Sequence, residues 1–139
     1  GLMAAVGLPS ILKALQKEGM RKAISDVTEA CKKTRAKAIW SGQKAVLEIR
    51  PSDNAFSIAG GSPGKGFDAI SSYTLPKDVN FVMVDINQMD FLGTEVAYIW
   101  FKPDGTSDEA IIGLHDRHDY EKITLDFATG IPQVSEFSR

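Results

Sequence analysis

Apolar and small side chains recur at steps of three and four residues along the first third of the chain. They are Ile11, Leu12, Leu15, Ala23, Ile24, Val27, Ala30, Cys31, Thr34 and Ala38. The basic residues between them fall elsewhere: Lys13, Lys17, Arg21, Lys33 and Lys37. This spacing predicts an amphipathic helix from Pro9 to Ser41, with the apolar stripe on one face and the basic residues on the opposite, solvent-facing side. We expect Gly42 to close the helix in the left-handed conformation. A helix of about 33 residues at about 1.5 Å each is ~50 Å long, which exceeds the width of a small domain.

The rest of the chain alternates short runs of β-forming residues with turn residues. Strands are predicted at residues 44–50, 54–58, 79–85, 96–102, 110–115, 120–127 and 131–134. In the third of these, alternation places Val79, Phe81, Met83 and Asp85 on one face of the strand and Asn80, Val82 and Val84 on the other. Turns are predicted at residues 51–53, 103–105 and 116–119, with a glycine-rich loop at 59–67. Because no helix separates these strands, antiparallel pairing is favoured.

The predicted fold class is therefore α+β, with one long N-terminal helix packed on one or two small antiparallel sheets. A chain of 139 residues suits a single compact domain. We divide it into a charge-free helical stretch at residues 1–12, the amphipathic helix at 13–42 and the β domain at 43–139. Residues 13–139 are expected to form one globular unit.

Composition and charge narrow the classes of function. The chain is 43% hydrophobic and 24% charged, which excludes a disordered chain. Its net charge of −2 hides a split: residues 13–50 carry ten Lys/Arg and four Asp/Glu, whereas residues 51–139 carry six and fourteen. The two parts are therefore expected to attract each other, within one molecule or between copies. A single cysteine excludes an internal disulfide framework.

The first twelve residues, GLMAAVGLPSIL, contain no charged side chain. The stretch is shorter than the roughly 20 apolar residues that span a bilayer. It also lacks the basic region and the cleavage site of a secretory signal peptide. Two interpretations remain open: an apolar helix end packed on the core of the domain, or the remainder of a membrane segment that further apolar residues upstream would complete.

Three short motifs carry chemically active residues in incomplete patterns. The loop AGGSPGKGF lacks the first glycine and the Ser/Thr of a phosphate-binding loop, so a flexible surface loop is favoured. The motif HDRHD at residues 115–119 offers no third metal ligand, which favours a solvated hairpin turn over a zinc or copper site. The motif PDGTSDE carries Asp104, Asp108 and Glu109 without the EF-hand pattern, and a calcium-stabilised loop stays open there.

No catalytic arrangement emerges from the remaining residues. Cys31 lies on the apolar stripe, where a buried thiol is more common than a nucleophile. The basic segment KKTRAK at residues 32–37 has only Trp40 as an aromatic neighbour, so a solvated helix face is favoured over nucleic-acid binding. The sequence shows no G-x-S-x-G motif. It therefore predicts a protein that is not an enzyme, with no catalytic residues, no cofactor and no resident metal.

Four stretches, in their order along the chain, resemble the type IV pilin-like proteins. Residues 1–9, GLMAAVGLP, are similar to the second half of the family's membrane helix, with Pro9 at its proline. Residues 34–46, TRAKAIWSGQKAV, are similar to the end of the helix and the entry into the first strand. Leu75-Pro76 followed by Val79 matches an LP-x-x-V step, while IWFKPDGTS and ITLDFATG resemble the last strands and turns. The match is best to H-type minor pseudopilins of type II secretion and FimT-like minor pilins (the GspH/FimT family).

The resemblance implies a structural subunit made as a prepilin. It implies that the leader is cleaved, that the new N-terminus is methylated, and that a single-pass helix anchors the protein in the bacterial inner membrane with the globular domain in the periplasm. Family members begin with a basic leader ending in glycine, followed by a phenylalanine and a glutamate in the membrane segment. This sequence shows neither, so we expect it to lack the N-terminal half of the membrane helix. Subunits of this kind assemble into a secretion pseudopilus or a type IV pilus.

The resemblance also suggests roles for particular residues. Membrane anchoring and packing between subunits are expected from Leu2, Met3, Val6, Leu8, Pro9, Ile11 and Leu12. The helix is expected to pack on its own sheet through Ile24, Val27, Cys31, Thr34 and Ala38. Charge contacts between subunits are expected to join Lys13, Lys17 and Arg21 to Asp104, Asp108 and Glu109.

The expected partners are other pseudopilins or pilins, the inner-membrane assembly platform and the membrane itself, without a small-molecule substrate and without nucleic acid. An alternative stays open: a pilin-like binding module that contacts DNA or a secreted protein through its loops.

Overall fold

A single helix, α1 (Leu2–Ser41), forms the whole first third of the chain. The computed structural model describes residues 2–60 and 71–136, with side chains described at residues 17–59 and 72–135. The predicted helix is confirmed and begins seven residues before Pro9. At its other end, Gly42 has a φ of +71° and donates its N–H to the carbonyl oxygen of Ala38 at 3.0 Å. This is the expected left-handed C-cap, which ends the helix before the first strand.

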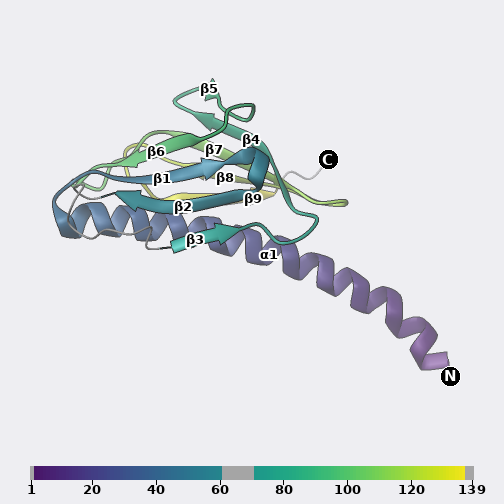
Figure 1. Cartoon of the computed structure of the whole chain (residues 1–139). Helices are drawn as coiled ribbons and strands as arrows, with labels where there is room; N and C mark the ends of the chain where they lie inside the picture. The colour runs from purple at the N-terminus through teal and green to yellow at the C-terminus, as the bar shows by residue number, and fades with distance from the viewer. Residues whose placement is uncertain (1, 61–70, 137–139) are drawn as a thin grey trace.

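Two antiparallel sheets follow the helix (Figure 1). The first sheet has the order β3 (Ser71–Thr74), β2 (Ala55–Gly60), β1 (Ala45–Arg50) and β6 (Ala97–Phe101). The second has the order β5 (Met89–Asp90), β4 (Asn80–Ile86), β7 (Ala110–His115), β8 (Tyr120–Leu125) and β9 (Pro132–Glu136). A 3₁₀ turn, η1 (Pro51–Asp53), joins β1 to β2 at the predicted turn. The α+β fold class is confirmed, and of the one or two sheets predicted the structure has two.

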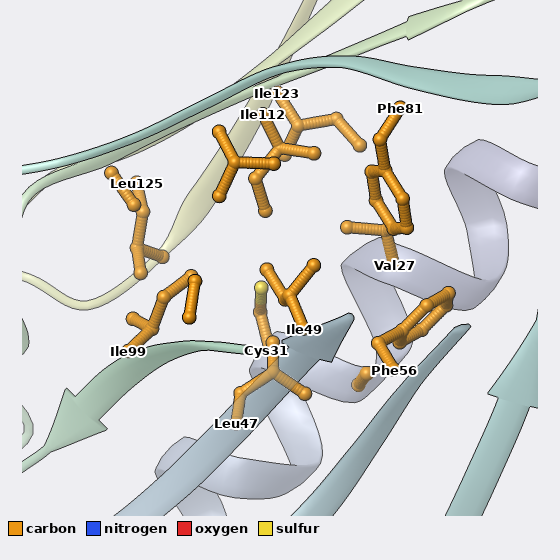
Figure 2. Close-up of a cluster of buried hydrophobic side chains, with 14 of the residues drawn as sticks. Val27, Cys31, Leu47, Ile49, Phe56, Phe81, Ile99, Ile112, Ile123 and Leu125 are labelled. Carbon is orange, nitrogen blue, oxygen red and sulfur yellow. The ribbon is translucent and has the colours of Figure 1, made fainter. Parts of the chain in front are cut away.

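One apolar core lies between the helix and the inner faces of both sheets. Figure 2 shows Val27 and Cys31 of α1 close to Ile49 of β1, with side chains of the second sheet completing the cluster. The predicted stripe is confirmed for the described side chains: Ala23, Val27, Ala30, Cys31, Thr34 and Ala38 are buried, and Ile24 packs against the core at its edge. The Thr34 hydroxyl donates to the carbonyl oxygen of Ala30 at 2.6 Å, so this buried polar group is satisfied within the helix.

The alternation predicted along β4 fails after Phe81. Val79 and Phe81 of the first predicted face are buried, but beyond them Val84 and Ile86 are buried in place of Met83 and Asp85. The reason is a β-bulge: the register against β7 shifts between Phe81 and Met83. An extra residue in one strand reverses which side chains face the core beyond it.

The inner strand β8 ends at Leu125, two residues before the predicted end, and further differences concern strands at the edges of the sheets. The sequence pattern did not predict β3 or β5, and β9 begins and ends one to two residues later than expected. β5 pairs with β4 across a two-residue turn in which Asn87 and Gln88 have φ values of +52° and +68°. Both central residues of a type I′ turn need positive φ, which the sequence Asn-Gln signals less clearly than Asn-Gly. The predicted loop at residues 59–67 begins later, because β2 continues to Gly60, and its remainder lies outside the described residues.

A short extended segment at residues 106–108 joins the two sheets. The backbone N–H of Asp108 donates to the carbonyl oxygen of Trp100 at 2.9 Å, and that of Lys102 donates to Thr106 at 2.8 Å. The N–H of Ser107 donates in the other direction, to the carbonyl oxygen of Phe127 at 3.0 Å. The segment thus covers the end of the outer edge of β6 and ties it to the turn after β8, which limits pairing of that edge with other chains.

The core predicts the effect of removing one of its central side chains. Leu47 of β1 is 0% exposed, so Leu47→Ala should leave a cavity and lower the free energy of unfolding by about 2–5 kcal/mol. Met89 is 63% exposed, and Met89→Ala should change it by less than about 0.5 kcal/mol. Urea unfolding followed by circular dichroism measures both. Equal, small effects of the two substitutions would contradict the shared core.

Candidate functional site

The N-terminal part of α1 extends beyond the sheets as a helical arm, which we define as residues 2–18 (Figure 1). Among the described side chains of α1, Met20 is the first that is buried, whereas Lys17 and Glu18 are exposed. At about 1.5 Å per residue, the arm is about 25 Å long. The predicted anchor residues all lie on this arm, in helical backbone: Leu2, Met3, Val6, Leu8, Pro9, Ile11 and Leu12. Their side chains lie outside the described residues, so their roles stay a prediction.

The described residues contain no helix with both the length and the apolar character that a bilayer span requires.

A basic surface begins where the arm meets the body of the domain. Lys17, Arg21 and Lys22 are exposed, and Lys22 pairs with Asp26 one turn later at 2.9 Å. Further along, Lys33 bonds Glu29 at 3.1 Å, and this bond raises the pKa of the lysine. Exposed pairs of this kind contribute little to stability. Because Lys17 and Arg21 are exposed, their charges lie in water, where a partner can contact them.

Lys37 corrects the prediction of a fully solvated basic face. It is half-buried, and desolvation lowers its pKa. Lys37 follows buried Thr34 by three residues and directly precedes buried Ala38, which places it at the border of the buried stripe.

Arg35 was predicted as part of the same solvated face, and this prediction is also wrong. The side chain is half-buried, and its Nε donates to the carbonyl oxygens of Gly105 at 3.2 Å and Thr129 at 2.9 Å. Gly105 lies in the turn after β6, and Thr129 lies in the turn between β8 and β9. One guanidinium thus connects the helix to a turn at the end of each sheet.

Two glycines make room for this contact. Gly105 has a φ of +91° and Gly130 a φ of +65°, which side chains rarely adopt. A Cβ on Gly130 would collide with the carbonyl oxygen of Gly105 and would lie 3.3 Å from Cδ of Arg35. The sequence marked both glycines as turn residues, but nothing in its pattern indicated that the two turns meet around an arginine 70 residues or more earlier in the chain.

The carboxylates of Asp104 and Asp108 in the PDGTSDE turn accept hydrogen bonds from nearby backbone. Asp104 accepts hydrogen bonds from the backbone N–H of Thr106 at 3.0 Å and from its hydroxyl at 2.6 Å, which lower the pKa of the carboxyl. Asp108 accepts from the backbone N–H of Trp100 at 3.0 Å. The backbone N–H of Glu109 donates to the side chain of Asn87 at 3.1 Å. The described part of the chain contains no group of three His, Cys, Asp or Glu residues placed to hold a metal ion.

The HDRHD motif forms the predicted hairpin turn between β7 and β8. Asp116 is 5% exposed and accepts backbone N–H bonds from His118 at 2.8 Å and Asp119 at 2.6 Å, while His115 and His118 are exposed. Elsewhere, burial raises the pKa of the Cys31 thiol to about 12, which keeps the sulfur protonated and unreactive at neutral pH. Asp116 therefore stabilises the turn, and Cys31 fills the core.

Solved pilin-like proteins share this arrangement of one long helix and two antiparallel sheets. One is the minor pseudopilin EpsH from the type 2 secretion system of Vibrio cholerae, with a TM-score of 0.67 at 11% identity over 90% of this chain and 98% of that one. A second structure of EpsH gives 0.64 at 14% identity, over 86% and 97% of the two chains. Another is the type IV minor pilin FimU of Pseudomonas aeruginosa, with 0.64 at 11% identity over 86% and 90%.

The chain therefore has the type IV pilin-like fold of minor pseudopilins and minor pilins, as its sequence motifs predicted. No protein-family model and no curated protein sequence matches the chain. The likeness thus rests on architecture at low sequence identity, and it shows the fold alone.

The Arg35 contact predicts that two left-handed glycines respond differently to the same substitution. Gly42→Ala places a Cβ in open space, so it costs only the left-handed backbone, about 1–2 kcal/mol. Gly130→Ala adds a collision with Gly105 and Arg35, so its total cost should reach about 3 kcal/mol or more. Chemical unfolding of the two variants measures the difference. Equal costs would show that the two turns are not held against each other.

Proposed function

We propose that this protein is a structural minor pseudopilin or minor pilin, not an enzyme. The observation that carries the proposal is the division of α1 into two parts. From Met20 to Ala38 the helix packs into the core of its own domain, whereas residues 2–18 extend past the sheets. Residues 2–12 of this arm carry no charged side chain, so they have to be covered by lipid or by other subunits. In a filament subunit, lipid covers the arm before assembly and neighbouring subunits cover it afterwards.

In this proposal the chain is made as a prepilin and held in the bacterial inner membrane by a single-pass helix. The arm supplies part of that helix through Leu2, Met3, Val6, Leu8, Pro9, Ile11 and Leu12. The globular domain lies in the periplasm, and the mature N-terminus is methylated. The subunit then leaves the membrane with the help of the assembly platform and joins a secretion pseudopilus or a type IV pilus, in which neighbouring subunits replace the lipid around the arm. Its partners are other pseudopilins or pilins, and its role is to support protein secretion or pilus function.

Charge complementarity supports contacts between neighbouring subunits. Lys17 and Arg21 are exposed at the base of the arm, next to Lys13 in the sequence pattern. Asp104 is exposed and Asp108 and Glu109 are half-buried near the far end of β6. Pairing of these groups between copies would set the register of one subunit against the next.

A pilin-like binding module remains the second candidate, because exposed apolar side chains occur on a turn. Phe127 is 59% exposed and Ile131 is 45% exposed in the connection between β8 and β9. Apolar groups of this kind suit a secreted protein better than DNA, which binds through Lys and Arg.

The proposal is tested by mass spectrometry of the mature N-terminus in the native host, using the gene in its full genomic context. We expect a cleaved leader and a methylated residue upstream of GLMAAVGLP, and we expect both to disappear in a strain without the leader peptidase. A chain that begins near Gly1 without processing, recovered outside the membrane fraction, would overturn the membrane-anchored subunit and favour the binding module.

A charge reversal tests the contacts between subunits. Lys17→Glu should reduce incorporation into the filament about tenfold, because an attractive contact becomes a repulsive one of similar size. Arg117→Glu reverses an exposed charge on the hairpin between β7 and β8 and serves as the matched control. Immunoblots of sheared filaments against membrane fractions measure incorporation. Equal incorporation of the two variants would remove Lys17 from the interface and leave the filament role in place.

A further inference from the structure

The outer face of the first sheet carries two exposed aromatic side chains on one strand. Along β6, Ala97, Ile99 and Phe101 are buried in the core, so the alternating Tyr98 and Trp100 lie on the opposite side of the sheet. Tyr98 is 43% exposed and Trp100 is 44% exposed, and they lie about 6.7 Å apart along the strand. Neither ring stacks on another aromatic ring in the part of the chain that the structure describes, so both are open to a ligand.

The strand register places further residues on the same side of the sheet. Cross-strand partners point to one face, so three rows can be followed across the four strands. The rows join Trp100 with Val46 and Ala59; Tyr98 with Glu48, Ser57 and Ser72; and Arg50 with Ala55 and Thr74. We call this surface the aromatic face. In these rows β2 and β3 contribute only alanine, serine and threonine side chains, which keep that part of the face low beside the two rings.

Two charged side chains on the aromatic face have unused hydrogen-bonding capacity. Glu48 and Arg50 are both half-buried, and neither forms an ion pair or a side-chain hydrogen bond with the described residues. A carboxylate accepts hydrogen bonds and a guanidinium donates them. The face therefore offers an acceptor and a donor directly beside its apolar rings, which is the usual composition of a site for a small polar ligand.

The balance of charge separates the classes of ligand. The face and the segment that follows β6 carry three cations and three carboxylates, which are Lys44, Arg50, Lys102, Glu48, Asp104 and Asp108. A surface for single-stranded nucleic acid needs an excess of positive charge along the backbone. A protein interface keeps charged residues out of its centre, whereas Glu48 lies in the middle row beside Tyr98. An uncharged ligand with both apolar and hydroxyl groups fits this surface better than either.

The strand edge beneath Trp100 is already ordered. Asp108 bonds the backbone of Trp100 twice, through its own N–H at 2.9 Å and through its carboxylate at 3.0 Å. A binding surface that is ordered beforehand loses little conformational entropy when a ligand arrives.

We propose that the aromatic face binds a linear, uncharged glycan whose sugar rings form a flat ribbon, as the chains of cellulose and chitin do. A pyranose ring of such a chain has apolar C–H faces, which stack on Tyr98 and Trp100, and hydroxyl groups around its edge. Glu48 accepts hydrogen bonds from these hydroxyls and Arg50 donates to them. The low side chains of β2 and β3 leave room for a flat chain to lie across the sheet. This binding activity goes beyond the filament role and does not depend on it.

The two tryptophans of the chain allow a direct test. Trp40→Phe leaves Trp100 as the sole indole, so the fluorescence of the whole chain reports on the aromatic face. Titration with cellohexaose or chitohexaose should shift the emission of Trp100 to a plateau, with half-saturation between about 10 μM and about 1 mM, the range of a weak, open site. Maltohexaose, whose chain coils instead of lying flat, should bind at least about tenfold more weakly.

A reporter on the other side of the sheet serves as the control. In Trp100→Phe the fluorescence comes from Trp40, which is 88% exposed on α1. Because α1 packs against the inner face of the first sheet, the emission of Trp40 should not change with either sugar.

Two substitutions in the Trp40→Phe chain identify the groups that bind. Tyr98→Ala removes one stacking ring and should weaken binding at least about tenfold. Glu48→Gln keeps the shape of the side chain but removes its charge, and should weaken binding severalfold, because hydrogen bonds to a charged acceptor are stronger. The matched control is Val134→Ala, which shortens an exposed apolar side chain on β9 of the second sheet and should leave the affinity unchanged. Circular dichroism confirms that the variants stay folded.

Three results would overturn the proposal. The first is an emission of Trp100 that stays constant up to about 10 mM of both flat hexasaccharides. The second is an equal effect of Tyr98→Ala and Val134→Ala. The third is binding of maltohexaose or of a short oligothymidylate as tight as that of the flat chains, which would mean stacking without selection for a flat glycan. Because the experiment uses the purified chain, each of these results leaves the test of N-terminal processing unaffected.

Discussion

The packing of one helix against two sheets at once is the constraint on which the rest of the structure depends. Each sheet buries only one face, and neither inner face is covered unless α1 and the other sheet lie across it. The helix meets this demand with small residues: Ala23, Ala30, Cys31 and Ala38 are all fully buried. The stripe between Met20 and Ala38 therefore packs within the domain, whereas residues 2–18 of the same helix extend past the sheets.

Apolar packing holds these layers together but does not by itself fix how far the helix is rotated or shifted along the sheets. Directional bonds at the end of the stripe supply that information. Arg35 bonds turns from both sheets, and Gly130 leaves the space in which those turns meet. The tie at residues 106–108 adds a second connection between the sheets that does not involve the helix. These bonds fix the arrangement of the turns after β6 and between β8 and β9, at the end of the domain far from the arm.

Most of the fold could be predicted from the sequence because periodicity reports burial directly. The steps of three and four residues gave the helix and its buried face, and the spacing of turn residues gave most of the strands. What periodicity cannot report is a change of register inside a strand, so the bulge near Phe81 reversed the later residues of β4. It also cannot report contacts between residues far apart in the chain. Arg35 was therefore predicted to lie in solvent with the neighbouring lysines, because its partners are in turns far along the sequence.

The geometry of α1 also determines how the domain responds to a mechanical load. Because the arm and the buried stripe are one uninterrupted helix, a pull along the arm acts parallel to the contact between α1 and the sheets. The load is then shared along the whole stripe as shear, and it is not concentrated on the first buried turn as it would be in peeling. Arg35 lies near the trailing end of that contact, where its bonds to both sheets oppose sliding.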